Sequence, residues 1–505
     1  MFKICSSLRE NPRAHRGWRI ALAGLWLMCA VFLHGAAFRW LPTRIWGDWQ
    51  EYLMMQVGIA EYGRLSVVPE AAEKADHYVQ EADTSARLLW RADFEKLAHA
   101  EIPAVAGAYR SPRNGKYYFG HFFFYNILTV PAHYLCLWLD IPPFRAMTLT
   151  NVWIWLAVLA YVLLENRFPW KARALAFALG VLSPMAWYLD FKGPELLTQA
   201  GIFAAVLSCL ARRPFLSITC TLVAALQNPS AAAWMIVPLW RLVKEKNYLK
   251  LVKGLILASL VWLPSAFYMY LFNTPNVLAS SFLQTENITL SRLWSAYLDL
   301  QQGLILGYPL AFPIFLIWAL VRAFKKDFEG LAWLGITVLM WLPLLSQSNW
   351  HPGQIRMLRY GAWIGLVFQA GLVGIYLQTS KNIFKYLLSV VLGFNIWYFI
   401  ATGFIFQQNY YYCDFNSAVR WVFRNRPSWY NPDIEIFAEC VLKFEKDFTQ
   451  DSILIYRDPK SGAPLKVAIK KGLSDSFLRN SLDEHFLLRN PHRSPAGRNW
   501  FYLNP

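Results

Sequence analysis

Charged side chains are scarce in this chain, and acidic side chains are the scarcest. Only 16% of the 505 residues are charged, and the 32 acidic residues are outnumbered by 49 lysines and arginines. Hydrophobic residues make up 56% of the chain and aromatic residues 17%, which is too apolar and too aromatic for a soluble enzyme of this length. The composition therefore predicts an all-α polytopic membrane protein.

Metal, redox and nucleic-acid motifs are also missing from the sequence. The seven cysteines form no CxxC pattern and no cluster with histidine, so we expect neither a zinc nor a redox site. Cys413 and Cys440 both fall in a segment that we place outside the cytoplasm, where they could form a disulfide. The net charge of +17 suits loops held against anionic lipid. No segment resembles a nucleic-acid-binding module, so we expect a lipid bilayer and no nucleic acid as partner.

The basic residues set the expected orientation. Residues 1–19 carry five lysines and arginines and precede an apolar run at about 20–38 that is long enough to span a membrane. The positive-inside rule places this N-terminus in the cytoplasm. The run has no small-residue cleavage site, so it is predicted to be an anchor. Residues 39–120 then form the first extracytoplasmic loop, with helices on the membrane face near 70–74 and 91–96.

The next apolar segment, at about 121–140, is predicted to lie in the interface or to re-enter without crossing. Pro131 interrupts it, and His121, Asn126 and His133 give it a polar edge. If it crossed, the basic residues between 167 and 173 would lie outside, against the positive-inside rule.

The remaining apolar runs alternate across the membrane with basic loops on the inner side. They lie at about 147–165, 172–189, 195–211, 215–226, 230–243, 251–272, 304–321, 331–347, 361–377 and 384–406. With the first span they give about eleven transmembrane helices in a domain at 20–406. The odd number places residues 407–505 outside, as a small α/β domain with a helix at 433–446 and a hairpin at 452–469.

Polar groups collect on the predicted outer side. Asp48 and Glu51 directly follow the first span, a membrane-surface setting in which acids usually serve chemistry. Asp190, Lys192 and Glu195 lie in a turn broken by glycine and proline. Further along are Arg145, Asp299 with Gln301, and a stretch with His351, Arg356 and Arg359. The last two arginines lie outside against the charge rule, which indicates an anionic partner such as a phosphate.

This layout resembles the GT-C glycosyltransferase superfamily. The similar features are the acid after the first span, the interfacial segment, the acid-bearing second outer turn and the late Asn349-Trp350 to Arg359-Tyr360 stretch. The nearest branch is that of protein O-mannosyltransferases and lipid A aminoarabinose transferases, and the resemblance covers about residues 18–410. The chain departs from the family where Gly120-His121 replaces the usual His-Pro-Pro, and where Asp48 lacks an adjacent glutamate.

The resemblance implies transfer of a sugar from a polyprenyl-phosphate carrier to an acceptor hydroxyl at the extracytoplasmic face, with inversion. The acceptor would be a glycolipid, a polysaccharide or a protein, and the location a bacterial inner membrane. Such a reaction needs a base on the hydroxyl and a stabiliser for the leaving phosphate. We assign Asp48 as the base, with Glu51 as a helper or a solvated neighbour, and Arg356 with Arg359 as the phosphate ligands.

The other outer residues are weaker candidates for substrate binding. Lys192 and Arg145 are expected near phosphate, Asp190, Glu195, Asp299 and Gln301 near sugar or acceptor, and His121 and His351 near ligand. No cofactor is required, because arginine and lysine can neutralise a monophosphate, although a divalent ion on Asp48 and Asp190 stays an alternative. Two other functions stay open, namely a transporter or flippase of lipid-linked sugars and a non-catalytic envelope assembly subunit.

Overall fold

The structure is a computed structural model that separates into two compact units. It describes residues 16–40, 48–82, 104–105, 107–348, 350, 353–355, 357–379, 382–402, 413–443, 452–473, 492–497 and 500–504. The first unit comprises residues 1–283, 310–343 and 362–407, and the second comprises 284–309, 344–361 and 408–505. The region predicted as a separate domain from residue 407 therefore shares its unit with two earlier segments of the chain.

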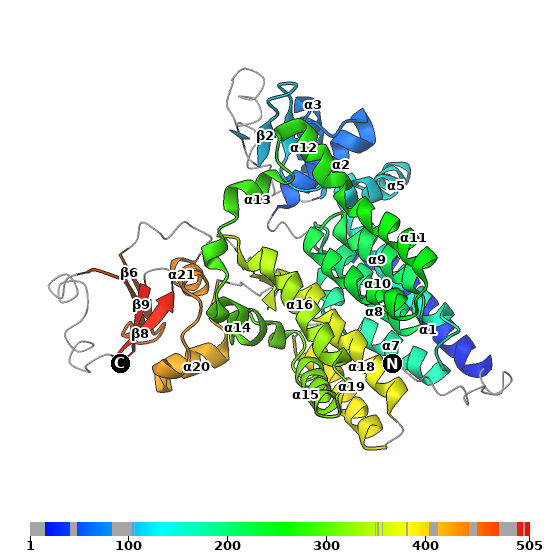
Figure 1. Ribbon diagram of the computed structural model, residues 1–505. Coiled ribbons are helices and arrows are strands. Elements are labelled where there is room, and N and C mark those ends of the chain that lie inside the picture. Colours follow the sequence, from blue (N-terminus) through cyan, green and yellow to red (C-terminus); the bar gives the residue numbers. More distant parts are fainter. Residues whose placement is uncertain are drawn as a thin grey trace. The chain divides into compact units, whose positions relative to one another are not determined.

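The described part of the chain is mostly helical, as predicted (Figure 1). A helix coincides with every apolar run that the sequence indicated. In the first unit these helices are α1 (Arg16–Gly35), α6 (Ala146–Leu164), α7 (Trp170–Val181), α8 (Glu195–Leu210), α9 (Pro214–Ala225), α10 (Ile236–Lys244), α11 (Tyr248–Ser259), α12 (Leu263–Phe272), α15 (Ala311–Phe324), α16 (Glu329–Leu345, whose last residues belong to the second unit), α18 (Leu366–Gln378) and α19 (Asn382–Thr402).

Three of the described helical segments are long and apolar enough to cross a membrane. They are Pro143–Leu164, Tyr248–Phe272 and Arg359–Gln378. Six further apolar helices are shorter, among them Glu195–Leu210 and Ala311–Phe324. The segment predicted to stay in the interface forms α5 (Phe124–Trp138), which is not among the three.

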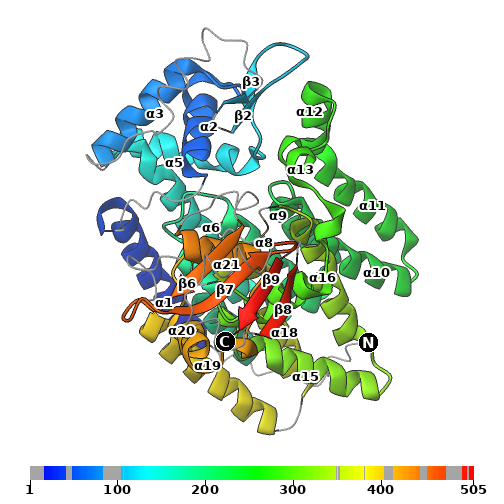
Figure 2. The same ribbon diagram turned by 90° about the vertical axis from the view of Figure 1, so that its left-hand side faces the viewer.

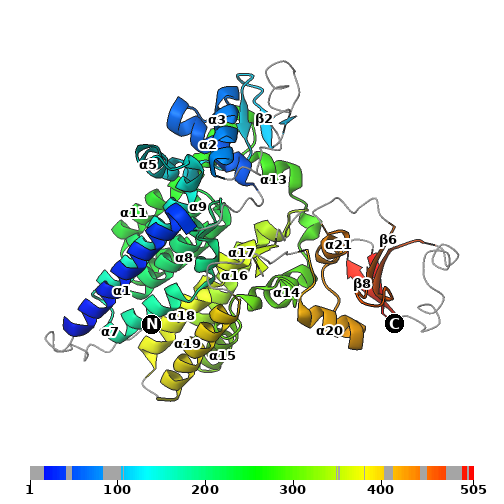
Figure 3. The same ribbon diagram turned by 180° about the vertical axis from the view of Figure 1, so that it is seen from behind.

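Helix α8 forms the centre of the first unit, because every one of its residues is buried. Its Gly201 lets α9 approach closely: a Cβ there would lie 2.8 Å from the carbonyl oxygen of Cys220. On another side α1 packs along α6, where Trp26 Nε1 donates to the carbonyl of Leu156 at 3.0 Å. Figure 3 shows α15, α18 and α19 running alongside each other in the same unit.

The predicted first loop contains α2 (Trp49–Tyr62), α3 (Pro69–Ala82) and a small antiparallel sheet of β1 (Ala104–Val105), β2 (Ala108–Arg110) and β3 (Tyr117–Phe119). A helix thus covers 70–74 as predicted, whereas 91–96 lies outside the described residues.

A network of hydrogen bonds connects α2, α3 and α5. Fully buried His133 faces Gln56 at 3.0 Å and Glu61 at 3.1 Å, and Glu61 also accepts from Tyr78 at 2.7 Å. Each of these four side chains therefore has at least one polar partner.

The second unit combines short helices with a four-stranded antiparallel sheet. The helical elements are α14 (Leu290–Leu298), α17 (Arg359–Ile364, whose last residues belong to the first unit), α20 (Ser417–Asn425) and α21 (Ile434–Leu442). A short hairpin joins β4 (Gly353–Ile355) to β5 (Met357–Leu358). The larger sheet has the order β6 (Ile453–Arg457), β7 (Pro464–Lys470), β9 (Trp500–Asn504), β8 (His492–Gly497) (Figure 2). The predicted helix after residue 432 and the predicted β6–β7 hairpin are confirmed. Cys413 and Cys440 are both buried free thiols, so the disulfide is not formed.

Candidate functional site

Two carboxylates and one imidazole meet at the start of α2. Asp48 is the residue before the helix and Glu51 lies in its first turn, so the i, i+3 spacing places both on one helical face. His121 comes from the segment between β3 and α5. Its Nδ1 lies 2.7 Å from Glu51 Oε2 and its Nε2 lies 3.4 Å from Asp48 Oδ2. We call these three residues the α2 acid cluster.

The three members differ in their exposure to solvent. The side chain of Glu51 is 7% exposed, that of His121 21% and that of Asp48 31%. Burial raises the pKa of Glu51, while His121 lowers this pKa and Asp48 raises it. A protonated imidazole can donate to both carboxylates, whereas a neutral ring can donate to only one. Asp48 is therefore the acid most accessible to a reactant, and Glu51 is the inner partner.

Contacts from distant helices hold His121 in place. The hydroxyl of Tyr268, on α12, donates to the carbonyls of Phe119 at 2.7 Å and His121 at 2.8 Å. The ring of Tyr52 packs against the His121 ring with centroids 5.4 Å apart. The side-chain amide of Asn126 donates to the Tyr52 carbonyl. His121 is therefore fixed by α2, α5 and α12 together.

Glycine 107 brings the backbone against Glu51. Its φ is +80°, and a Cβ at this position would lie 2.3 Å from Glu51 Oε1. The carbonyl of Gly107 accepts from the amide of Gly120, next to His121. Only glycine fits both the backbone angle and the close approach. Sequence reasoning missed Gly107, because its role depends on a contact with a residue more than fifty positions away.

The turn that the sequence predicted as the second outer turn contributes a buried group in the same unit. Asp190, Lys192 and Glu195 are all buried, with exposed fractions of 1%, 3% and 5%. A charge-rich turn is solvated by default, but here all three side chains are shielded from solvent. Asn151 holds the turn in place by donating to the carbonyls of Tyr188 and Phe191.

One aromatic ring links this turn to the α2 acid cluster. Lys192 donates to Thr148 and lies over the ring of Phe144 at 5.2 Å. The same ring meets Trp49, the residue after Asp48, edge-on with centroids 5.7 Å apart. The predicted outer groups of the first unit therefore gather in one region. Nearby, Arg145 donates to the carbonyl of Ala37 at 3.0 Å, which ties it to the end of the first helix.

Other predicted site residues belong to the second unit. Asp299 is buried and accepts from the hydroxyls of Ser295 and Tyr430 and from the amides of Gln301 and Gln302. The side chain of Gln301 bonds to the backbone of Asp414 and Asn416. Because protein groups use these polar atoms, the contacts favour a structural role over the predicted contact with sugar.

The predicted phosphate ligands also fall in the second unit. Arg359 begins α17, with its guanidinium 5.3 Å from the Tyr360 ring centroid. His351 and Arg356 lie outside the described residues.

Among the described residues, no three histidine, cysteine or acidic side chains are grouped to hold a metal ion. Comparisons with known protein families, curated proteins and solved structures give no match for this chain.

Proposed function

We propose that this protein is an integral membrane glycosyltransferase that moves a sugar from a polyprenyl-phosphate donor to an acceptor hydroxyl at the extracytoplasmic face. The observation that supports it best is the α2 acid cluster. A partly exposed carboxylate, Asp48, is held beside an imidazole that a buried carboxylate, Glu51, positions. This arrangement can accept a proton from a hydroxyl that approaches from solvent.

The proposed reaction is a single displacement at the anomeric carbon. The acceptor oxygen forms its bond to this carbon as its proton passes to Asp48, and the bond to the carrier phosphate breaks. The polyprenyl phosphate leaves with the electron pair of that bond. Glu51 and His121 act as positioning residues, since His121 contacts Asp48 and Glu51 holds the His121 ring in place. Within the first unit, Lys192 is the proposed partner of the phosphate.

The surface of α11 and α12 supports a membrane location. The segment Tyr248–Phe272 is apolar, yet only 17% of its most apolar window is buried inside the protein. Its exposed side chains include Ile256 at 64% and Trp262 at 66%. Such a large apolar surface is unfavourable in water and is suited to lipid.

The test measures transfer from a labelled polyprenyl-phosphate sugar pool in membranes with matched protein levels. Asp48→Asn keeps the size of the side chain but removes the base, so we expect a loss of about 10²- to 10⁴-fold in product with accumulation of carrier-linked sugar. Glu73→Gln is the matched control, because Glu73 is an exposed carboxylate on α3 in the same predicted loop.

Undiminished product from Asp48→Asn would remove Asp48 as the base. Movement of carrier-linked sugar across the membrane without any glycosylated acceptor would favour the transporter alternative. If the protein supports normal envelope assembly but shows neither sugar transfer nor movement of carrier-linked sugar, the assembly-subunit alternative would be favoured.

A further inference from the structure

A cavity of about 810 Å³ lies in the first unit, away from the α2 acid cluster. Its walls come from α10, from the turn between α15 and α16, and from the first turns of α16. Its volume is within the range of about 300 to 1,000 Å³ that is usual for small-molecule sites. All of the segments at its rim belong to loops that the positive-inside rule assigns to the cytoplasm.

The inner wall of the cavity is apolar and partly uncovered. Ile236, Trp240, Phe328 and Trp333 contribute to it. Trp240 is 57% exposed and Phe328 is 61% exposed, although tryptophan and phenylalanine are normally well buried. Such a wall suits hydrocarbon better than a soluble polar ligand.

The rim of the cavity is charged, and two of its three carboxylates are already neutralised. Glu329 pairs with Arg241 at 3.4 Å, and Asp327 pairs with Arg322. Glu245 is the third carboxylate at the rim.

Two lysines remain at the rim as sources of positive charge. Within the part of the chain that the structure describes, neither Lys244 nor Lys326 forms an ion pair with a carboxylate. Lys244 instead lies 5.6 Å from the centroid of the Trp240 ring. The rim therefore offers positive charge directly above an apolar wall.

We propose that this cavity binds an anionic glycerophospholipid of the cytoplasmic leaflet. Its phosphate contacts Lys244 and Lys326, and its acyl chains run along Trp240 and Phe328. A basic rim over an apolar wall matches an anionic headgroup joined to hydrocarbon, as in other basic pockets between membrane helices. The proposal rests on the membrane location that the proposed function also requires, but it does not depend on sugar transfer.

The proposal is tested by competition between two lipids for the full-length protein in detergent. Retention of phosphatidylglycerol and phosphatidylcholine with identical acyl chains is compared by native mass spectrometry. We expect the wild type to prefer phosphatidylglycerol, and Lys244→Gln and Lys326→Gln each to weaken this preference about fivefold, which corresponds to about 1 kcal/mol per basic residue at an anionic membrane surface. Lys253→Gln is the control, because Lys253 is an exposed lysine on α11 outside the cavity, and it should keep the preference.

Two added competitors separate the sources of the phosphate. Inorganic phosphate lacks hydrocarbon and should not displace phosphatidylglycerol, and polyprenyl phosphate should displace it poorly. Equal retention of the two lipids by the wild type would overturn the proposal, as would an unchanged preference in both lysine variants. Displacement by inorganic phosphate would identify a simple anion site, and tight lysine-dependent retention of polyprenyl phosphate would identify a carrier site. Lipid retention is the readout, so loss of sugar transfer by Asp48→Asn neither supports nor contradicts this assignment.

Discussion

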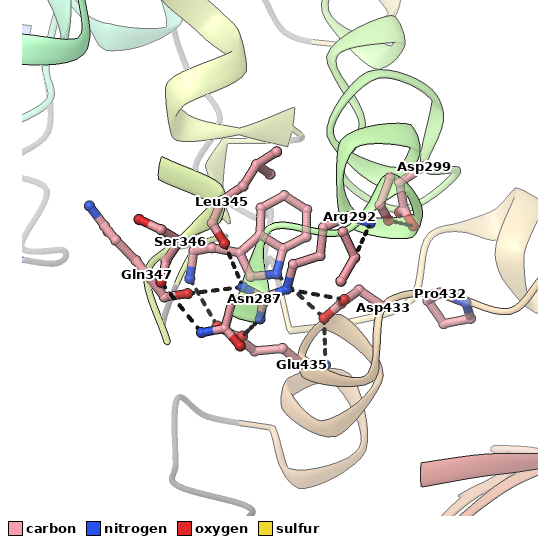
Figure 4. Close-up of polar contacts among 12 residues, drawn as sticks. Asn287, Arg292, Asp299, Leu345, Ser346, Gln347, Pro432, Asp433 and Glu435 are labelled. Atoms are coloured by element: carbon pink, nitrogen blue, oxygen red, sulfur yellow. Dashed lines mark hydrogen bonds and ion pairs between the residues drawn. The ribbon is translucent and has the colours of Figure 1, made fainter. Parts of the chain in front are cut away.

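The protein groups two carboxylates around a basic side chain in both of its units, and the two groups differ in exposure. In the α2 acid cluster, two carboxylates flank His121, and Asp48 and His121 stay 31% and 21% exposed. In the second unit, Asp433 and Glu435 flank Arg292, and none of these side chains is more than 9% exposed (Figure 4). The first arrangement leaves a carboxylate accessible to a reactant, whereas the second buries its charged side chains almost entirely.

In the buried group of Arg292, Asp433 and Glu435, backbone amides and carbonyls form the further hydrogen bonds. Arg292 also donates to the carbonyls of Leu345 at 2.8 Å and Gln347 at 3.0 Å, and Glu435 accepts from the amide of Trp350 at 3.0 Å. Three segments far apart in sequence are thereby joined within the second unit. A saturated buried network of this kind contributes to structure. The two groups share an aspartate and a glutamate, and they differ in exposure and in the saturation of their hydrogen bonds. This difference separates a candidate reactive site from a structural one.

The largest effect on stability is expected from Arg292→Leu, which removes the cation of the buried group. Two buried carboxylates would lose their partner, which costs about 3 to 5 kcal/mol. Hydrogen exchange of the amides in β7 and β9 would report the lower opening free energy of the second unit. Arg420→Leu is the matched control, because Arg420 is an exposed arginine of the same unit; we expect a change within about 0.5 kcal/mol. Equal effects of the two variants would contradict the comparison.

A smaller effect, measured as a loss of sugar transfer, is expected from Gly107→Ala. The added Cβ would displace the Glu51 carboxylate, and with it His121, so transfer should fall about 10- to 100-fold. Gly115→Ala provides the control, since Gly115 has a similar φ of +70° but its nearest atom is Arg110 Nη2 at 3.7 Å. Both variants carry backbone strain, but only Gly107→Ala should lose activity. A matching loss in Gly115→Ala would show that strain, and not contact with Glu51, is responsible.

The smallest expected effect concerns Lys466, a buried lysine on β7. It donates to the carbonyl of Pro427 at 2.7 Å and to Asn431 Oδ1 at 2.6 Å, and it lies 4.7 Å from the ring centroid of Tyr502. Burial lowers the pKa of Lys466 to about 7. In the pH range between this value and the usual 10.5, the unfolded chain binds the proton more tightly than the folded protein does. The free energy of unfolding therefore decreases as the pH falls through this range, and it becomes constant below about pH 7.

The difference in unfolding free energy between wild type and Lys466→Met should therefore change by about 1 kcal/mol from pH 7 to pH 8 and by about 1.4 kcal/mol from pH 8 to pH 9. Hydrogen exchange of the second unit at pH 7, 8 and 9 measures it, with Lys460→Met as the exposed control. A pH-independent difference would show that burial does not shift the pKa of Lys466.

The helices were predictable because they depend on local pattern. Long apolar runs bounded by glycine, proline and basic residues marked α6, α8 and α18, and the helix and hairpin of the C-terminal region were found in the same way. The i, i+3 spacing also indicated correctly that Asp48 and Glu51 share a face of α2. The function of these residues stays a proposal, since spacing alone does not distinguish a base from a helix cap.

Contacts between distant segments were not predictable from local pattern. The sequence by itself determined where most helices form and which acids stand at the start of α2, because periodicity and helix-breaking residues act over a few positions. Only the tertiary structure decided that His121 joins Asp48 and Glu51, that Gly107 approaches Glu51, and that Asp299 and Gln301 are used within the protein. These outcomes depend on which side chains meet after packing, and a single sequence carries no local signal for such long-range contacts.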